Sequence, residues 1–255
     1  MLSLVSVNIE GRMHLDRVMP FVKEQQPDVL CIQELGEPDL AAFEQAIGGT
    51  GFFMPMMRIP ENARTAGGQG PAVLGVGIVS RFPIVRHAVH YYHRASDTTP
   101  EFDSATVESK HATQNLGVLV ADIEKEGALY RVATTHFTWT PKSGEPDDLQ
   151  RADARKLLEL VAPEGEMIFC GDFNAPRGGE IDALFTEHWR EQIPAGYTTS
   201  IDVSLHRNGQ KNPDDFNNLM VDHLFTTPSY TAHDVRLIFG VSDHAAIVAN
   251  VERVG

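Results

Sequence analysis

The chain has few cysteines, few tryptophans, few basic residues relative to acidic ones, and few long apolar runs. Its 255 residues include two cysteines, Cys31 and Cys170, each inside a short apolar run. Two such thiols make no disulfide framework, and without a CxxC pair they indicate no structural zinc site. We therefore expect both to behave as small, buried hydrophobic side chains.

Positive charge is also scarce, since 21 Lys and Arg face 35 Asp and Glu for a net charge of −14. No basic cluster is visible in the sequence, which disfavours sequence-independent binding to a nucleic-acid backbone. A basic rim assembled in three dimensions stays open. No apolar run is long enough to cross a bilayer. The first residues, MLSLVSVNIEG, lack the features of a signal peptide, so we expect no membrane span and a cytoplasmic location.

The composition, 42% hydrophobic and 22% charged, is typical of a globular protein. Short β-rich runs occur at Leu2–Ile9, Val29–Gln33, Val73–Ser80, Leu116–Ile123, Tyr130–His136, Met167–Cys170, Asp222–Thr226 and Ala246–Val251. Helical spacing of apolar residues occurs at Met13–Gln25, Leu40–Ile47 and Asp147–Val161. Strands mostly follow strands, which predicts an α+β fold of two packed sheets with helices outside. Without repeats or linkers, we expect a single domain over residues 1–255; the oligomeric state is not readable.

Three segments read as long loops: Pro55–Gly70, Tyr91–Thr113 and His206–Asn218. Loops of this length in a compact domain commonly form the rim of a functional site. We expect substrate selectivity to depend on Tyr91–Thr113. Trp139 either lines such a rim as a stacking surface or is buried.

The stretch MIFCGDFNAPRGGE, residues 167–180, is the most informative local signal. A buried strand ends there and is followed at once by Asp172 and Asn174. Residues two apart in an extended segment point to the same side, so these two side chains are predicted to face one spot. The alternative is an ordinary turn, because Gly, Asp, Asn and Pro are also the usual turn formers.

Other predicted strands end in residues of the same chemistry. Asn8 lies near the end of the first strand, Glu34 follows the second, and His136 ends the run YRVATTH. Asp222 begins another strand, and the pair Asp243 and His244 precedes the last one. Each residue alone has an ordinary interpretation as a surface, strand-end or partly buried polar group. Their repetition at successive element ends favours a common site.

The motifs SVNIEG, PDVLCIQE, GVGIVSRFPI, ATTHF, CGDFNAP, VDHLF and SDHAAIVANV occur in this order over nearly the whole chain. In this order and with these separations, the sequence resembles the endonuclease/exonuclease/phosphatase superfamily of metal-dependent phosphoesterases. The resemblance implies a DNase I-like, four-layered α/β sandwich, in which two mostly antiparallel sheets are flanked by helices. It also implies a site at one edge of the two sheets.

The same resemblance suggests a role for each residue. Glu34 is similar to the main metal carboxylate, with Asn8 beside it and Asp243 nearby. Asp172 resembles the residue that orients or deprotonates the attacking water and contributes to the metal site. Asn174 resembles its neighbour that holds the phosphate or a second metal.

Three further residues complete the implied site. His244 resembles the histidine that binds a phosphoryl oxygen, with Asp222 as its carboxylate partner, and His136 stands where relatives face the reacting phosphate. Two positions depart from the family pattern. Val7 stands where an aromatic residue often precedes the asparagine, and Gln114 stands where relatives often have arginine, which removes one phosphate-binding cation.

These residue types suit hydrolysis of a phosphate ester, because carboxylate and amide oxygens are ligands that Mg²⁺ or Mn²⁺ prefers. A nucleic acid, a nucleotide, a phospholipid head group and a sugar phosphate all stay open as substrates, as does the choice between diester and monoester. The alternative function is a non-catalytic relative that binds a phosphorylated ligand or a protein.

Overall fold

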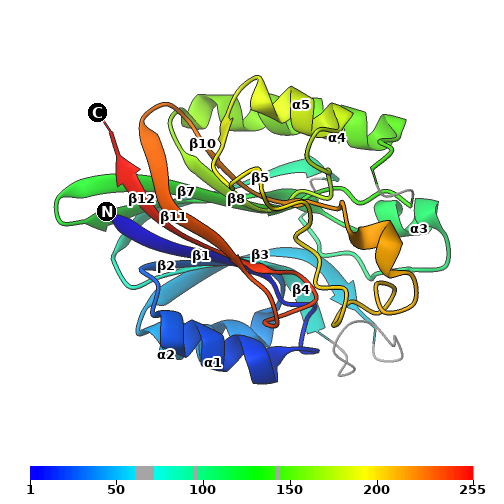
Figure 1. Cartoon of the computed structure of the whole chain (residues 1–255), viewed down its shortest axis with the longest axis horizontal. Helices are drawn as coiled ribbons and strands as arrows, with labels where there is room; N and C mark the ends of the chain where they lie inside the picture. Colours follow the sequence, from blue (N-terminus) through cyan, green and yellow to red (C-terminus); the bar gives the residue numbers. More distant parts are fainter. Residues whose placement is uncertain (61–71, 95–96, 142–143, 255) are drawn as a thin grey trace.

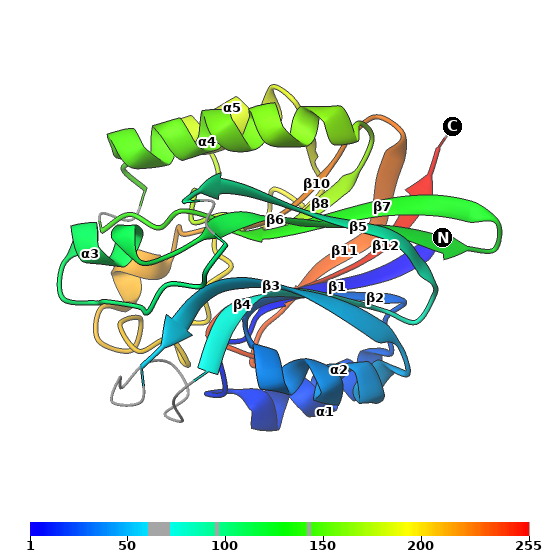
Figure 2. The same cartoon turned by 180° about the vertical axis from the view of Figure 1, so that it is seen from behind.

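The structure, a computed structural model, describes residues 1–60, 72–94, 97–141 and 144–254. Its centre is two six-stranded sheets (Figures 1 and 2). The first sheet has the order β11-β12-β1-β2-β4-β3, from β1 (Leu2–Asn8), β2 (Val29–Gly36), β3 (Thr50–Ile59), β4 (Ala72–Ser80), β11 (Tyr230–Ile238) and β12 (Ala246–Arg253). The second has the order β5-β6-β7-β8-β10-β9, from β5 (Ile84–His93), β6 (Leu116–Lys125), β7 (Ala128–His136), β8 (Ile168–Asp172), β9 (Arg190–Glu191) and β10 (Asp222–Thr226).

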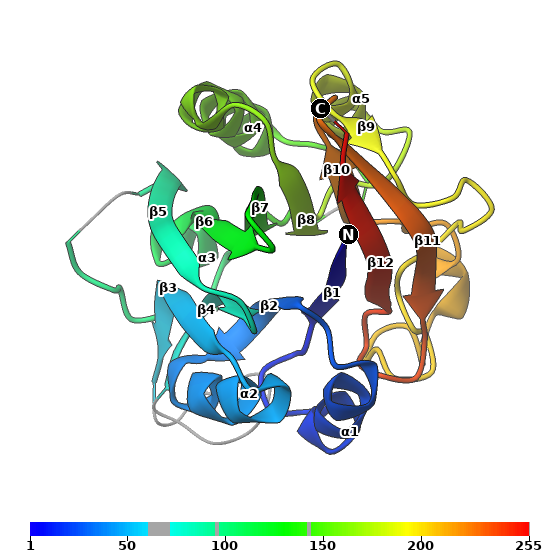
Figure 3. The same ribbon diagram turned by 90° about the vertical axis from the view of Figure 1, so that its left-hand side faces the viewer.

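Helices cover the outer face of each sheet, which confirms the predicted four-layered sandwich. Helices α1 (Leu15–Gln25) and α2 (Leu40–Ile47) lie on the first sheet, whereas α4 (Asp148–Val161) and α5 (Glu180–Thr186) lie on the second (Figure 3). The strand pairs β1–β2 and β7–β8 are parallel and the other pairs in the two sheets are antiparallel. The sheets are therefore mostly antiparallel, as predicted.

Strand β1 shows how alternation in the sequence builds these layers. Leu2 and Leu4 belong to the hydrophobic cluster between the two sheets, whereas Val5 and Val7 belong to the cluster beneath α1 and α2. Because successive side chains point to opposite faces of a strand, Asn8 continues the line of Leu2 and Leu4. The strand therefore delivers an amide to the space between the sheets.

A polar layer separates the apolar core from the site end of the sandwich. Gln33 on β2 donates hydrogen bonds to Ser6 Oγ at 3.2 Å and to Thr134 Oγ1, across the sheets, at 2.9 Å. Below it, Cys31 and Cys170 are free and fully buried, which confirms their predicted character. The single domain over residues 1–255 stays a prediction from the sequence.

Two of the three predicted loops are partly wrong. Pro55 to Ile59 continue strand β3, which pairs with β4 as far as Ile59, and residues 61–70 lie outside the described residues. The segment Tyr91–Thr113 completes β5 and contains a short helix, α3 (Val107–Ala112), while its residues 95–96 are not described. A six-residue helix carries too little periodicity to be recognised from its apolar residues. In His206–Asn218, irregular turns surround one 3₁₀ helix, Pro213–Phe216, close to expectation.

The strands that the sequence did not predict include the edges of the sheets. Strands β3 and β11 flank the first sheet, and β5 and β9 flank the second. Strands β5 and β11 bury only some of their residues, so their sequences lack the apolar runs that mark central strands. Central strands such as β2, β8 and β10 are almost fully buried and were predicted.

Glu164 joins the end of α4 to the second sheet. Its carboxylate accepts hydrogen bonds from Arg86 Nη1 at 2.7 Å and Nη2 at 2.8 Å, and it lies 2.7 Å from His90 Nε2. The hydrogen bonds from Arg86, opposed by burial and supported by His90 and by the charge of Arg131, lower the pKa of Glu164 to about 2. The ionised carboxylate therefore stabilises the folded state.

The stability that Glu164 contributes is expected to depend on pH. Because its folded-state pKa is lowered, the contribution is complete above the unfolded-state value and is lost as the pH falls toward 2. Glu164→Gln is expected to lower the free energy of unfolding at pH 7 by about 1–2 kcal/mol, since Arg86 is partly exposed and water screens the pair. Urea denaturation from pH 7 to pH 2.5 measures this; Glu159→Gln, at an exposed site on α4, is the control. If Glu164→Gln lowered the free energy of unfolding equally at pH 7 and pH 2.5, the lowered pKa of Glu164 would be contradicted.

Gly171 allows strands β7 and β8 to approach directly beneath the site. It adopts a φ of 143°, and a Cβ at this position would collide with the carbonyl oxygen of Thr135. Glycine alone tolerates both the dihedral angle and the contact. The glycine therefore fixes the position of Asp172, the next residue.

Gly171→Ala is expected to destabilise the protein by at least about 2 kcal/mol, because backbone atoms must move to remove the collision. Gly196→Ala is the matched control, because a Cβ there meets open space, and we expect it to change stability by no more than about 0.5 kcal/mol. Equal urea midpoints for the two variants would show that β7 and β8 are not so tightly apposed.

Candidate active site

Three predicted site residues form a row across neighbouring strands of the second sheet. His136 ends β7, Asp172 ends β8 and Asp222 begins β10, and the register pairs Asp172 directly with each of the other two. Directly paired residues project to the same face of a sheet. His136 Nε2 accordingly lies 3.5 Å from Asp172 Oδ2. The sheet thus gathers residues that lie far apart in the sequence.

Asn8 connects this row to the first sheet. Its Nδ2 donates to Asp172 Oδ2 at 3.0 Å and to Glu34 Oε1 at 3.3 Å. Its amide oxygen accepts the backbone N–H of Glu10 at 3.1 Å. In this arrangement Asn8 is a donor between two carboxylates; its role as a metal ligand stays a prediction.

A β-bulge directs Glu34 into the same space. The pairing of β2 with β4 shifts register between Ile32 and Leu35, and Glu34 adopts a φ of 55°. Such bulges reorient a side chain and are frequent beside active sites. Glu34 therefore lines the cavity next to Asn8 rather than following the alternation of its strand.

Asn174 shows that the two interpretations of residues 172–174 are compatible. Its φ is 47°, and its backbone N–H donates to Asp172 Oδ1 at 2.9 Å. This hydrogen bond from the backbone to the side chain two residues earlier defines an Asx turn. Its side-chain Nδ2 donates to the carbonyl oxygen of Phe137 at 2.9 Å. The turn itself holds Asp172 and Asn174 at the cavity wall.

His244 is held between two carboxylates. Its Nδ1 lies 2.7 Å from Asp222 Oδ2, and its Nε2 lies 3.8 Å from Asp172 Oδ2. Burial alone would lower its pKa, but the charges of Asp222 and Asp172 and the hydrogen bond to Asp222 raise the pKa of His244 well above its usual value. The ring is therefore an imidazolium that offers one N–H toward the cavity. The predicted pairing with Asp222 is present.

Asp243, the residue before His244, lines the same cavity. Burial, opposed by His244 and supported by the charges of Glu10 and Glu34, raises the pKa of Asp243 to about 6. The sequence analysis did not single out Glu10, although it follows Asn8 by two residues, the same spacing that marked Asp172 and Asn174. Glu10 lines the cavity and pairs with Arg207 Nε at 2.8 Å.

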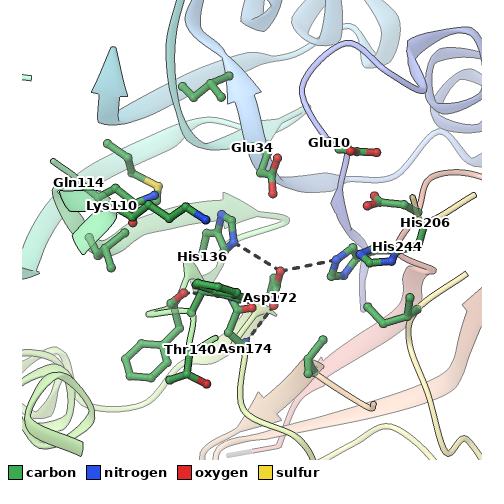
Figure 4. Close-up of a pocket in the computed structure, with 18 of the residues that line it drawn as sticks. Glu10, Glu34, Lys110, Gln114, His136, Thr140, Asp172, Asn174, His206 and His244 are labelled. Carbon is green, nitrogen blue, oxygen red and sulfur yellow. Dashed lines mark hydrogen bonds and ion pairs between the residues drawn. The ribbon is translucent and has the colours of Figure 1, made fainter. Parts of the chain in front are cut away.

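Six of the predicted residues line one cavity of about 530 Å³, namely Glu34, His136, Asp172, Asn174, Asp243 and His244, while Asn8 and Asp222 hydrogen-bond to lining residues without lining it themselves (Figure 4). Seven of the eight predicted catalytic or metal-binding residues are joined there by contacts within 4 Å, and Asp243 lines the same cavity. Gln114 also lines it, and its Nε2 lies 3.3 Å from Met57 Sδ. Val7, the second departure from the family pattern, packs on the helix side of β1 instead.

The donor atoms fit a hard divalent cation. Glu10, Glu34, Asp172 and Asp243 line the cavity with carboxylate oxygens, the ligand type that Mg²⁺ and Mn²⁺ prefer. Two groups of three possible ligands each include residues of the cavity lining: Asp172 and His244 with Asp222, and Glu10 and Asp243 with His14. Glu34 lines the cavity but belongs to neither group. Both cysteines are in the core, so the chemistry of the site favours Mg²⁺ or Mn²⁺ over zinc.

A third acidic and histidine-containing group, Asp182, Glu191 and His223, does not line this cavity. His223 Nε2 lies 2.9 Å from the carbonyl oxygen of Ala175, and its Nδ1 faces Glu191. Burial lowers the pKa of His223, but the hydrogen bond and charge of Glu191 raise it overall. The imidazolium and nearby Arg177 balance the two carboxylates, so this group serves as a structural ion pair.

Comparison with known proteins decides the family. The model of the Endonuclease/Exonuclease/phosphatase family matches residues 5–244. The chain belongs to the endonuclease/exonuclease/phosphatase family. Members of this family are mostly hydrolytic phosphoesterases and generally depend on a divalent metal. Among curated proteins, none matches the sequence significantly.

Solved structures of family members share the fold. An endonuclease/exonuclease/phosphatase from Beutenbergia cavernae is 15% identical with a TM-score of 0.69, over 100% of this chain and 72% of that one. The catalytic domain of human Nocturnin with bound sulfate is 16% identical, with a TM-score of 0.65 over 99% and 93%. A mannosyl-6-phosphatase from Bacteroides thetaiotaomicron is 14% identical, with a TM-score of 0.65 over 99% and 100%. At these identities the likeness shows the fold alone.

The crowding of carboxylates predicts that metal and stability are linked. Without a cation, Glu34→Gln is expected to raise the melting temperature by about 2–4 °C, because it removes one of several charges that repel each other. Saturating Mg²⁺ or Mn²⁺ is expected to raise the melting temperature of the wild type more than that of Glu34→Gln. Thermal denaturation with EDTA and with each metal measures both effects. Glu187→Gln, an exposed substitution, is the control, and an identical metal response in wild type and Glu34→Gln would exclude Glu34 as a ligand.

Proposed function

We propose that the protein is a divalent-metal-dependent hydrolase of phosphate esters that directs water to phosphorus. The observation that carries this proposal is the convergence of Asp172, Glu34 and His244 on one cavity from both sheets, with Asn8 hydrogen-bonded to both carboxylates. A relative that only binds ligands needs no such complete set. We therefore favour hydrolysis over the ligand- or protein-binding alternative.

In this proposal Asp172 is the general base. Its Oδ1 is held by the Asn174 backbone N–H and its Oδ2 by Asn8, which fixes the carboxylate at the end of β8. Water attacks phosphorus, its proton passes to Asp172, and the bond from phosphorus to the ester oxygen breaks. A general base in this position typically contributes about 10²–10⁴-fold to the rate. Asn174 lines the wall beside it and is positioned to contact the phosphate.

The charged imidazole of His244 stabilises the phosphate. Asp222 holds its Nδ1–H, so the Nε2–H points toward the cavity and donates to a phosphoryl oxygen as negative charge develops. His136, on the other side of Asp172, is positioned to face the same phosphate (Figure 4). His244 supplies a hydrogen bond and charge, and His136 supplies a hydrogen bond, without a covalent step.

Glu34 and Asp243 are the residues proposed to hold Mg²⁺ or Mn²⁺, with Asn8, Asp172 and Asn174 beside them. When bound, the ion supplies Lewis-acid stabilisation of a phosphoryl or leaving oxygen. The same chemistry serves a diester or a monoester, and a nuclease is one case of it.

Among the helices of the described part of the chain, none combines the length and hydropathy of a membrane span. The cytoplasmic location stays a prediction from the sequence.

Release of p-nitrophenol from p-nitrophenyl phosphate and from bis-p-nitrophenyl phosphate tests the proposal. Wild-type turnover is expected to require Mg²⁺ or Mn²⁺, and Asp172→Asn and His244→Ala are each expected to lower kcat/KM at least about 10²-fold with an unchanged circular dichroism spectrum. Asp148→Asn and His233→Ala, at exposed sites, are the matched controls. Full activity in Asp172→Asn, or turnover undiminished by EDTA, would sink the proposal.

A further inference from the structure

One side of the cavity is an apolar wall. Met57, Ile59, Leu74 and Phe102 form a hydrophobic cluster of their own, separate from the main core, and all four line the cavity. The wall is fixed by backbone pairing, because the Phe102 N–H donates to the carbonyl oxygen of Arg58 at 2.8 Å. It therefore presents a preformed apolar surface to a molecule bound at the carboxylates.

An aromatic ring and an ammonium group stand beside this wall. Trp139 is 39% exposed although it is large and apolar, and Lys110 Nζ lies 4.9 Å from the centre of its ring. His111, the next residue of α3, lies 2.9 Å through Nε2 from the carbonyl oxygen of Trp139. A capping box of Thr106 and Ser109 begins this short helix. Lys110 and Trp139 are thus held together at the cavity.

Positive charge is scarce on the rest of the lining. Among the described residues of the lining, the Lys and Arg side chains are Lys110 and Arg207, and Arg207 donates through Nε to Glu10 at 2.8 Å. Lys110 extends from the α3 side toward His136, so its ammonium is available to one phosphate (Figure 4). A nucleic-acid strand needs several cations along its successive phosphates. The cavity has no such track among the described residues, and its volume is that of a small-molecule pocket.

We propose that the substrate is a compact phosphate ester whose aromatic or apolar organic group lies against Trp139 and the wall of Met57, Ile59, Leu74 and Phe102. Lys110 contacts its single phosphate. When the substrate's ring stacks on Trp139, it displaces the Lys110 ammonium from that position. The flexible side chain of Lys110 then lets its ammonium reach the phosphate. This inference rests on the proposed hydrolase function and names its substrate class.

Binding of two phosphonates that are not hydrolysed tests the subsite independently of turnover. Isothermal titration calorimetry of the Mg²⁺-loaded protein is expected to show phenylphosphonate binding at least about tenfold more tightly than methylphosphonate, because only the former has a ring to bury. Trp139→Ala is expected to reduce this preference to about threefold or less. Phe216 is a partly buried aromatic residue of the cavity lining that belongs to a different hydrophobic cluster from the wall; Phe216→Ala is the matched control and is expected to keep the preference.

The phosphonate group, which both probes share, tests the role of Lys110. Lys110→Gln is expected to weaken phenylphosphonate and methylphosphonate by the same factor, about tenfold, and Lys110→Arg is expected to restore most of the loss. Lys156→Gln, on the surface of α4, is the control. Thermal denaturation of each variant separates a lost contact from a lost fold.

Equal binding of the two phosphonates, or equal effects of Trp139→Ala and Phe216→Ala, would overturn the inference. Oligothymidylate binding more tightly than phenylphosphonate would also overturn it, in favour of a nucleic-acid strand. These outcomes are distinct from failure of the proposed function. Turnover of both nitrophenyl esters with no phenyl preference contradicts only the subsite, whereas a phenyl preference without turnover contradicts only the hydrolase.

Discussion

The repulsion among carboxylates at one end of the sandwich is the constraint around which the site is built. Asp172 lies at its centre and is nearly buried, so its charge must be matched locally. Asn8 and the Asn174 backbone donate hydrogen bonds to it, while His136 and His244 flank it. These contacts come from both sheets, which means that the site also ties the sheets together. The remaining negative charge makes the cavity a place for a cation.

The fold supplies this arrangement through ordinary strand geometry. Alternation along β1 sends Leu2 and Leu4 into the core between the sheets and Asn8 into the site. Cross-strand register aligns His136, Asp172 and Asp222 in one row. Two local departures from regular strand geometry, the bulge at Glu34 and the turn at Asn174, orient the remaining side chains toward the cavity. Gly171 permits the close strand approach beneath them.

The central strands and the main site residues were predictable because they carry local signals. Buried strands such as β8 are apolar runs, and Asp172 with Asn174 shows the two-residue spacing of a strand end. The edge strands β5 and β11 lack such runs, which is why they were missed, whereas the apolar run of β3 is interrupted by Pro55, a residue typical of loops. Contacts across the chain also leave no local trace: the pairing of Arg207 with Glu10 spans 197 positions. The position of Lys110 at the cavity was not predicted, because the six-residue helix α3 that carries it is too short to be recognised from its apolar spacing.

The cavity is lined both by the carboxylates of Glu34, Asp172 and Asp243 and by an apolar surface that includes Trp139. The central claim is that these carboxylates hold the metal on which hydrolysis depends. An anomalous difference map from crystals soaked in Mn²⁺ tests it most directly. We expect a manganese peak in contact with Glu34 and Asp243. A peak only at Asp182, Glu191 and His223, or none at saturating Mn²⁺, would contradict it.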